Sequence, residues 1–519
     1  MPAIGLKASM AGTQTHFEFY AAQEAETARL AAWLAAQAQA GWLVFLNGDL
    51  GAGKTAFARG LVKAKCGPYT RVPSPSFTLA QPYETCTPPI LHSDLYRLTE
   101  PSEVEELGLL DALDSHICIV EWASRARDIL PSPTVTVTLS LLEGEPEARQ
   151  ITIEAAPEII AGLTAAQARE EALQSFLAKA GWGEAVRADL AGDASTRRYE
   201  RLSFPDGRRG VLMDWAKGPD GPAIYDGKSY SQMAHLAEAM PAYCAMVDWL
   251  GAHGLSSPDI LARDEAQGFA LMEDFGDRHI ANDETLDRAV FYREAVANLA
   301  HLHQSPAADF LAPYDGKVQA VEADLFTQWY LPYCGIEISQ AAAQSWHALW
   351  VQLGDTLLVE PSVSVLRDYH SVNLLWREGA QARFRVGLID VQDALAGHAA
   401  YDVSSLLCDA RVDVDPDLQA QAYEHYCATR FGTDAKARAA FQTAYAICAV
   451  QRNLKIAGIF VRLCERDHKP AYLKHLPRVL GYIQTHLDQP ALAPVAQWLE
   501  RHAPEWLEGH APEWLRQTS

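Results

Sequence analysis

Apolar residues recur at helical spacing in the alanine-rich stretch 21–40, where Leu30, Trp33 and Leu34 share one face. This spacing predicts a helix. The uninterrupted apolar run 42–46 follows it and is typical of a buried strand, because a strand covered on both faces carries apolar residues on both sides.

The first third of the chain continues in the pattern of an α/β unit. A second apolar run, 117–120, predicts another buried strand, and residues 134–139 and 150–154 alternate like two strands joined by a turn at 143–146. Alternating helical and strand patterns that close with a hairpin predict one domain over residues 16–157.

The pattern changes after this unit. A helix is expected over 164–180, strands and turns mix up to residue 277, and a mostly helical region with one β island at 363–391 follows. This order predicts a small α/β lobe, a larger helical lobe and a tail. Their expected limits are 165–277, 278–500 and 501–519.

Composition narrows the class of protein. The chain has 519 residues, of which 49% are hydrophobic and 21% charged, as in a globular protein with several cores. We find no apolar run long enough to span a bilayer and no export signal. Nine dispersed cysteines without metal-binding spacing predict reduced thiols in the cytoplasm. The net charge of −23 disfavours broad binding to nucleic acid or to an anionic membrane.

A complete phosphate-binding motif separates the run 42–46 from a helical stretch. Its glycines let backbone N–H groups turn toward phosphate oxygens, Lys54 adds a positive charge for the β- and γ-phosphates, and the Thr55 hydroxyl is suited to ligate Mg²⁺. The strand before it and the helix after it are the context that such a loop requires. The residues expected to bind ATP here are Gly48, Asp49, Leu50, Gly51, Ala52, Gly53, Lys54 and Thr55.

Two carboxylates follow apolar segments downstream of this motif. Asp94 ends the stretch 91–94, and Glu121 ends the strand predicted at 117–120. Either is suited to hold Mg²⁺, directly or through water, or to polarise the attacking water. A solvated carboxylate at a strand end is the simpler interpretation of one such residue, but the pair beside a P-loop favours catalysis.

These motifs, together with the sequences Ser-Pro-Ser-Phe at 74–77, His-Ser-Asp-Leu-Tyr-Arg-Leu at 92–98 and Val-Glu-Trp at 120–122, resemble the bacterial TsaE-type ATPases over about residues 20–155. The resemblance implies Mg²⁺ contacts from Thr55 and Glu121 and a need for Asp94 in ATP hydrolysis. It also implies partner proteins that make threonylcarbamoyladenosine in tRNA. Ser76 stands where the family usually has threonine and keeps the hydroxyl.

A second phosphate-handling pattern lies in the helical half. Arg367-Asp368 is followed five residues later by Asn373, which is the spacing of a kinase catalytic loop. An aspartate there orients the acceptor hydroxyl and takes its proton, while the asparagine oxygen binds Mg²⁺. Asp390, which follows the next strand pattern, is expected to bind the same metal. The apolar strand 269–272 leads through Glu273 toward the helical half, where adenine would meet the backbone between two kinase lobes.

Several kinase features are missing. No Asp-Phe-Gly follows the catalytic loop, so phosphorylation of proteins is not expected, and no lysine stands in the strand 211–214. Arg197, Arg198 and Lys217 are the candidates to replace that lysine, and the sequence does not choose among them. Asp193, Ser195 and Arg197 lie in a loop that we expect to cover the nucleotide phosphates.

The second half resembles the aminoglycoside/choline phosphotransferase superfamily over about residues 165–500, on the catalytic loop at 367–376, on Gly-Leu-Ile-Asp-Val-Gln-Asp-Ala at 387–394 and on further blocks at 192–199, 211–214, 325–330 and 451–455. Within it, these blocks are similar to amino sugar kinases of the AmgK type. That resemblance implies phosphorylation of the anomeric hydroxyl of N-acetylmuramate and N-acetylglucosamine in peptidoglycan recycling. Arg452 and Lys455 are candidates to bind a lactyl carboxylate, although a charged helix face explains them equally well.

The sequence therefore predicts an α/β P-loop domain followed by a two-lobed, protein-kinase-like α+β domain, each using ATP and Mg²⁺. Three alternatives stay open. The P-loop domain could sense nucleotide and regulate the kinase, the kinase-like half could bind nucleotide without turnover, or its acceptor could be an aminoglycoside, choline or homoserine.

Overall fold

The computed structural model describes residues 15–190, 197–216, 223–225, 227–237, 239–358, 362–380 and 384–507. The chain divides into two compact units, Met1–Ser175 and Phe176–Ser519, and the division falls within helix α5 (Pro157–Lys179). Each unit has hydrophobic cores of its own. The finer domain limits expected from the sequence stay predictions.

The first unit is built on a seven-stranded mixed sheet in the order β1-β7-β6-β2-β5-β4-β3. β2 is parallel to β5 and β6, and β4 is parallel to β5, whereas the other neighbours are antiparallel. The strands are β1 (His16–Ala21), β2 (Leu43–Asn47), β3 (Ala80–Tyr83), β4 (Ile90–Asp94), β5 (Ile117–Glu121), β6 (Val135–Leu142) and β7 (Glu145–Ala155).

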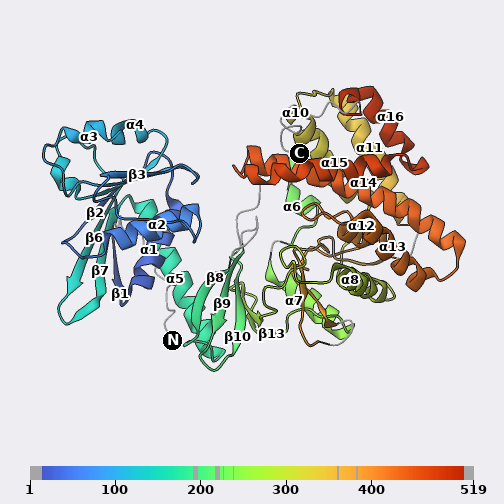
Figure 1. Cartoon of the computed structure of the whole chain (residues 1–519), viewed down its shortest axis with the longest axis horizontal. Helices are drawn as coiled ribbons and strands as arrows, with labels where there is room; N and C mark the ends of the chain where they lie inside the picture. The colour runs from blue at the N-terminus through green and yellow to red at the C-terminus, as the bar shows by residue number, and fades with distance from the viewer. Residues whose placement is uncertain are drawn as a thin grey trace, which may run out of the picture. The chain divides into compact units, whose positions relative to one another are not determined.

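Both faces of this sheet are covered, because alternate side chains of its central strands enter different cores. In β5, Ile117 and Ile119 join one core and Cys118 and Val120 the other. The first core includes α1 (Glu24–Gln37) and α2 (Lys54–Cys66), which pack against each other (Figure 1). The second core lies under the short helices α3 (Glu103–Glu106), α4 (Leu109–Ala112) and η1 (Ala123–Ala126). The predicted buried strands and the closing hairpin are confirmed.

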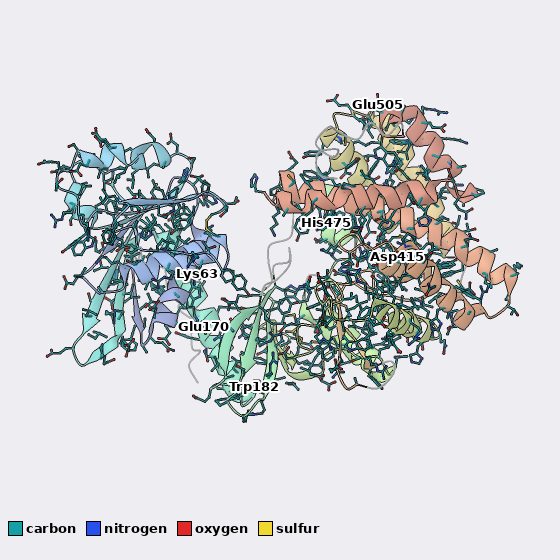
Figure 2. All side chains as sticks on the ribbon, in the orientation of Figure 1. Lys63, Glu170, Trp182, Asp415, His475 and Glu505 are labelled. Carbon is teal, nitrogen blue, oxygen red and sulfur yellow. A yellow bond between two sulfur atoms is a disulfide. The ribbon has the colours of Figure 1, made fainter. Side chains whose placement is uncertain are left out.

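The second unit begins with a small lobe around a five-stranded antiparallel sheet in the order β13-β14-β10-β9-β8. Trp182, labelled in Figure 2, precedes this sheet. Its ring centre lies 5.2 Å from that of Phe204. The elements of this lobe are β8 (Val186–Leu190), β9 (Arg198–Ser203), β10 (Arg209–Asp214), β11 (Ala223–Tyr225), β12 (Lys228–Ser229), α6 (Tyr230–Met233), α7 (Met240–Ala252), β13 (Ile260–Asp264) and β14 (Phe269–Glu273).

A helical lobe follows, as the sequence predicts, and it carries two short strand pairs, β15 with β18 and β16 with β17. Its long helix α14 (Ala435–Glu465) starts at Asp434, whose carboxylate accepts hydrogen bonds from Lys436 N and Ala437 N. The other elements are α8 (Arg288–Leu302), α9 (Gly316–Leu325), η2 (Phe326–Tyr330), α10 (Leu331–Tyr333), α11 (Gln340–Leu357), β15 (Val363–Val365), β16 (Leu374–Trp376), β17 (Val386–Leu388), β18 (Leu395–Gly397), α12 (Ala400–Leu407), α13 (Pro416–Phe431), η4 (Pro470–His475), α15 (Leu476–Leu487), η5 (Pro490–Leu492), α16 (Ala493–His502) and α17 (Pro504–Leu507).

Two sequence-based boundaries are wrong. The helix expected from residue 21 starts at Glu24, because His16–Ala21 forms an edge strand paired with β7. The helix expected from residue 164 starts at Pro157, since a proline is compatible with the first turn of a helix, where no intrahelical N–H bond is needed.

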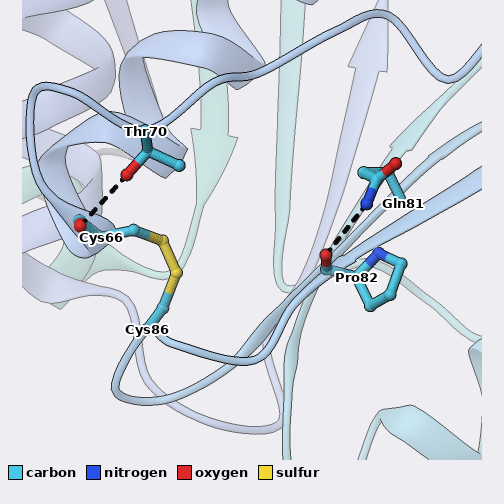
Figure 3. The surroundings of a disulfide bond; sticks show 5 residues. All are labelled: Cys66, Thr70, Gln81, Pro82 and Cys86. Atoms are coloured by element: carbon cyan, nitrogen blue, oxygen red, sulfur yellow. Dashed lines mark hydrogen bonds between the residues drawn. A yellow bond between two sulfur atoms is a disulfide. The ribbon is translucent and has the colours of Figure 1, made fainter.

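The prediction that all cysteines are reduced thiols is also wrong for one pair. Cys66, the last residue of α2, forms a disulfide with Cys86 in the β3–β4 connection, and their Cα atoms lie 4.6 Å apart (Figure 3). Their spacing of 20 residues gives no metal or redox motif, so only the fold brings them together. The seven other cysteines are free.

None of the helices in the described part of the chain combines the length and the apolar character needed to cross a membrane.

Candidate active sites

The P-loop connects the end of β2 to the start of α2. Gly48 has φ 139° and Gly53 φ 102°, in the left-handed region that side chains disfavour. A Cβ atom on Gly48 would lie 2.4 Å from the carbonyl oxygen of Leu139 in β6, so no other residue fits there. The loop therefore has the tight curl that the motif predicts, and its predicted residues, from Gly48 to Thr55, stand together at one end of the sheet.

Lys54 is buried at the base of this loop. Its Nζ donates to the carbonyl oxygens of Gly48 (2.7 Å) and Asp49 (2.9 Å) and lies 4.1 Å from the centre of the Trp122 ring. Burial lowers the pKa of Lys54, while the nearby carboxylates of Glu121 and Asp94 act in the opposite direction. The lysine charge is thus held beside the loop and both predicted acids.

Glu121 is in direct contact with the predicted metal-binding hydroxyl. Thr55 Oγ1 donates to Glu121 Oε1 over 2.9 Å, and His92 Nε2 lies 3.0 Å from the same oxygen. Glu121 and Asp94 are opposite each other in the parallel pair β4–β5, at the carboxyl ends of both strands. Ligands of open α/β sheets bind at that edge.

Asp94 is fixed by two hydrogen bonds. Ser76 Oγ donates to its Oδ2 over 2.6 Å, and the backbone N–H of Tyr96 donates to its Oδ1 over 3.0 Å. Ser76, which stands where the TsaE-type ATPases usually have threonine, therefore contacts the carboxylate that was predicted to act in hydrolysis.

Arg149 is a residue of this site that sequence reasoning missed. It projects from β7, and its Nε donates to Ala52 O over 2.9 Å while Nη2 lies 3.4 Å from Gly51 O. The arginine ties the P-loop backbone to the closing hairpin. No motif includes this residue, because its partners lie 97 and 98 positions away.

The kinase-like unit brings its three predicted acidic and amide residues together. Asn373 Nδ2 donates to the backbone oxygen of Asp368 over 3.1 Å and lies 3.5 Å from Asp390 Oδ2. The side chain of Asp368 is 35% exposed, so it is open to an acceptor. Asp390 has φ 60°, an uncommon conformation for a residue with a side chain and one that often marks functional sites.

Two buried carboxylates that the sequence did not single out hold the catalytic loop. Asp402 accepts hydrogen bonds from the backbone N–H groups of Leu366 (2.7 Å) and Arg367 (2.9 Å). Asp409 accepts from Ser371 N (2.9 Å) and Ser371 Oγ (2.5 Å). Both lie in the mostly apolar segment 400–410 and are buried. An acidic residue in such a segment usually has a structural partner, and this pattern could have marked both residues in the sequence.

Arg367 is part of a buried ionic cluster. Its Nη2 pairs with Glu322 of α9, which also accepts from Lys455 Nζ over 3.1 Å and from Tyr314 Oη over 2.5 Å. Burial opposes ionisation of Glu322, but Lys455 and Arg367 outweigh it and lower its pKa to about 2. Glu322 was not predicted.

Among the three candidates to replace the strand lysine, Arg197 contacts the predicted metal-binding residue. Its Nη1 lies 2.7 Å from Asp390 Oδ1, and its guanidinium carbon lies 5.1 Å from the centre of the Trp215 ring. Arg198 instead pairs with Glu200 and Asp214. Lys217 lies outside the described residues, as do Asp193 and Ser195 of the predicted phosphate loop.

Glu273 ends β14, between the two lobes in the chain, and its Oε1 accepts a hydrogen bond from Arg377 Nη2 over 2.6 Å. Its carboxylate is thus already paired. Any contribution of this residue to adenine binding would come from the backbone, as the sequence suggests.

The donor atoms at both sites suit Mg²⁺. Thr55 with Glu121, and Asn373 with Asp390, supply hard oxygen ligands. Within the described ranges, no group of three or more His, Cys, Asp or Glu is placed to hold a metal ion by itself. That is the expected situation for magnesium, which usually takes one or two protein ligands and completes its shell with phosphate and water.

The two sites define a P-loop nucleotide-binding domain joined to a phosphotransferase of kinase-like fold. Profiles of two families match the chain, "Threonylcarbamoyl adenosine biosynthesis protein TsaE" over residues 21–151 and "Phosphotransferase enzyme family" over residues 186–441. The chain belongs to both the TsaE family and the family of N-acetylmuramate/N-acetylglucosamine kinases, since similar proteins of each are covered almost completely. The predicted fold class and both predicted resemblances are confirmed.

The N-acetylmuramate/N-acetylglucosamine kinase of Caulobacter vibrioides is 34% identical over 362 residues, which make up 66% of this chain and 99% of that protein. The enzyme of the same name from Pseudomonas aeruginosa is 31% identical over 64% of this chain and 93% of its own length. The TsaE protein of Rickettsia bellii is 43% identical over 25% of this chain and 91% of its own length. The crystal structure of choline kinase from Cryptosporidium parvum aligns with 64% of this chain and 99% of its own, at 13% identity and a TM-score of 0.42.

Proposed function

We propose that the chain is a bifunctional cytoplasmic enzyme. Its second unit transfers the γ-phosphoryl group of ATP to the anomeric hydroxyl of N-acetylmuramate and N-acetylglucosamine, as in peptidoglycan recycling. Its P-loop domain hydrolyses ATP and acts with partner proteins that make threonylcarbamoyladenosine in tRNA. The kinase assignment rests on one observation above all: Asp368 is open to solvent, and Asn373 links it to Asp390. The kinship with named amino sugar kinases supports the choice of acceptor.

The proposed transfer needs one base at the acceptor. Asp368 accepts the proton of the anomeric hydroxyl while that oxygen forms its bond to the γ-phosphorus. The bond between this phosphorus and the β–γ bridging oxygen breaks, and ADP leaves. Mg²⁺ held by Asn373 and Asp390 would supply charge neutralisation at the phosphates. Burial raises the pKa of Asp368, but nearby positive charges, of which Lys455 contributes most, outweigh burial and lower the pKa overall, so the aspartate stays ionised at neutral pH.

In the P-loop domain, Lys54 and the loop amides bind the ATP phosphates, and Thr55 and Glu121 would hold Mg²⁺. Asp94 orients the attacking water. Its two hydrogen bonds, from Ser76 Oγ and Tyr96 N, fix the carboxylate and support this role.

The kinase proposal is tested with the full chain and Mg²⁺-ATP against N-acetylmuramate, N-acetylglucosamine, choline and an aminoglycoside. We expect ADP and a sugar 1-phosphate with the two amino sugars alone, and a loss of at least about 100-fold in kcat for Asp368→Asn. Turnover with choline or the aminoglycoside, but with neither sugar, would show that the proposed acceptor is wrong. Sugar-dependent turnover that survives Asp368→Asn would overturn the role of the base.

The independence of the two activities is tested by Lys54→Ala in the full chain. We expect this variant to lose ATP hydrolysis that depends on the tRNA-modification partners, while its sugar kinetics stay within about twofold of the unmodified chain. Altered sugar phosphorylation would instead favour the P-loop domain as a nucleotide-sensing regulator of the kinase.

A further inference from the structure

Arg452 is a buried arginine whose hydrogen-bond donors are not satisfied by the protein. It lies in α14, only 3% of its surface is exposed, and its Nε and Nη1 atoms have no hydrogen-bond partner within the described part of the chain. Leaving a buried charged donor unpaired costs more than an ordinary hydrogen bond contributes. Such a side chain therefore fits an anion that comes from outside the chain.

Two other buried cations near the catalytic loop have charged and polar partners within the chain. Arg367 donates to Ala234 O (3.1 Å) and Asp393 O (3.2 Å) in addition to its pair with Glu322. Lys455 donates to Glu322 and to the hydroxyl of Tyr401, both over 3.1 Å. Of the two residues that the sequence left open as carboxylate ligands, Lys455 thus has an internal role, whereas Arg452 is available.

Three buried carboxylates of this region are also engaged. Asp402 accepts backbone N–H groups of the catalytic loop, and Asp409 accepts from Ser371 and from the backbone N–H of Arg411. Glu322 is shared by two cations. These three carboxylates therefore have other partners, and no hydrogen bond or ion pair joins them to Arg452.

Arg452 is connected to the catalytic loop through its neighbour on α14. It precedes Lys455 by three positions on α14, so the two share a face of the helix. Lys455 reaches Glu322, which in turn holds the arginine that directly precedes Asp368. The charge of Arg452 also acts directly on Asp368 and on His370, whose Nε2 lies 4.0 Å from Asp368 Oδ1.

We infer that Arg452 binds the carboxylate of an acidic amino sugar, the lactyl group of N-acetylmuramate, and so makes this acceptor preferred over the uncharged N-acetylglucosamine. This inference rests on the proposed function of the kinase unit. The guanidinium of Arg452 has unpartnered N–H groups and suits a carboxylate, because it donates charge-assisted hydrogen bonds to carboxylate oxygens. Arg452 thus acts in specificity, and the proton transfer stays with Asp368.

The test compares both sugars in the full chain and in the variants Arg452→Gln and Arg452→Lys. We expect Arg452→Gln to raise KM for N-acetylmuramate about 10- to 100-fold and to leave KM for N-acetylglucosamine and ATP within about twofold. Arg452→Lys keeps the charge but loses the planar guanidinium, and we expect its KM for N-acetylmuramate to lie between those of the unmodified chain and Arg452→Gln. Arg462→Gln is the matched control: this arginine is also on α14 and has an unpartnered Nε, but its guanidinium lies over the Tyr230 ring at 4.9 Å.

A second arm uses the unmodified chain and the carboxamide analogue of N-acetylmuramate, so that it does not depend on the folding of any variant. We expect KM for the carboxamide to exceed that for the acid by a similar factor, and the difference to vanish in Arg452→Gln. Equal effects on the two sugars, or a raised KM for ATP with either of them, would overturn the inference and assign Arg452 to packing or to phosphate. A chain that does not distinguish acid from carboxamide would also overturn it. Absence of turnover with both sugars would overturn the proposed function itself, and the inference with it.

Discussion

The Nη1 atom of Arg197 lies 2.7 Å from Oδ1 of Asp390, so the arginine neutralises the carboxylate that is expected to bind magnesium. The guanidinium is held over the Trp215 ring at 5.1 Å, and its side chain is only 11% exposed. A kinase lysine has a comparable task, since it carries a positive charge to the nucleotide phosphates next to the metal. Arg197 is therefore the residue that we expect to replace the missing strand lysine.

Arg197→Met should weaken nucleotide binding. A charge-assisted hydrogen bond contributes about 1.5–3 kcal/mol, so we expect KM for ATP to rise about 10- to 100-fold with little change in KM for the sugar. Arg198→Met is the matched control, because Arg198 is 46% exposed and pairs with Glu200 and Asp214 instead. Steady-state kinetics with varied ATP measure both variants. If Arg198→Met raises KM for ATP more than Arg197→Met does, the phosphate contact belongs to Arg198 and our assignment is wrong.

The sequence predicted those parts of the sites whose residues are close along the chain. The P-loop and the trio of Asp368, Asn373 and Asp390 follow fixed spacings, because one loop or one hairpin has to bring their side chains together. The same logic gave the two strand-end acids of the P-loop domain, Asp94 and Glu121.

The missed residues are single side chains that distant segments contribute. Glu322 reaches Arg367 across 45 positions, and Arg149 reaches Ala52 across 97. Neither stands in a motif, so only packing reveals it. The strand His16–Ala21 was missed for a related reason. It is stabilised by its pairing with β7, which lies far away in the sequence, and its own residues give no clear strand pattern.

Arg149→Met should loosen the P-loop without unfolding the first unit. The arginine donates to carbonyl oxygens of the loop and of its own hairpin, so its loss frees backbone that has to stay curled around phosphate. We expect Kd for ATP to rise about tenfold, which corresponds to about 1.4 kcal/mol. Arg59→Met on α2 is the control, because Arg59 pairs with Glu24 at the surface. Isothermal titration with a non-hydrolysable ATP analogue measures Kd, and equal affinities of the two variants would contradict the role of Arg149.

The disulfide between Cys66 and Cys86 should stabilise the first unit in an oxidising buffer. It closes a loop of about 20 residues, for which the loss of chain entropy in the unfolded state predicts about 3 kcal/mol. We therefore expect a lower melting temperature of this unit when dithiothreitol is added, and no effect of dithiothreitol on the double variant Cys66→Ser/Cys86→Ser. Cys118→Ser, which changes a free buried cysteine, should keep the response to dithiothreitol. Two free thiols at these positions in mass spectra of the oxidised chain would refute the expectation.

Glu322 should make the stability of the kinase unit depend on acid pH. The folded-state pKa of this carboxyl is lowered to about 2 from its usual value of 4.5, so its ionised form is stabilised by folding. The contribution is fully present above about pH 4.5 and is lost as the pH falls toward 2, because the unfolded chain then binds a proton that the folded chain does not. A shift of this size corresponds to about 3 kcal/mol.

Glu322→Gln removes this dependence and leaves the charges of Arg367 and Lys455 without their shared partner. We expect the variant to lose about 3–5 kcal/mol of unfolding free energy at pH 7, because removing one partner of a buried ion pair leaves the other charge buried and uncompensated. Scanning calorimetry from pH 7 to pH 3.5 should show the two melting curves converging as the pH falls. Glu337→Gln changes an exposed glutamate of the same lobe. Its melting temperature should follow that of the unmodified chain over the whole pH range. If the melting temperature of Glu322→Gln shows the same pH dependence as that of the unmodified chain, the cluster does not stabilise the fold through the charge of Glu322.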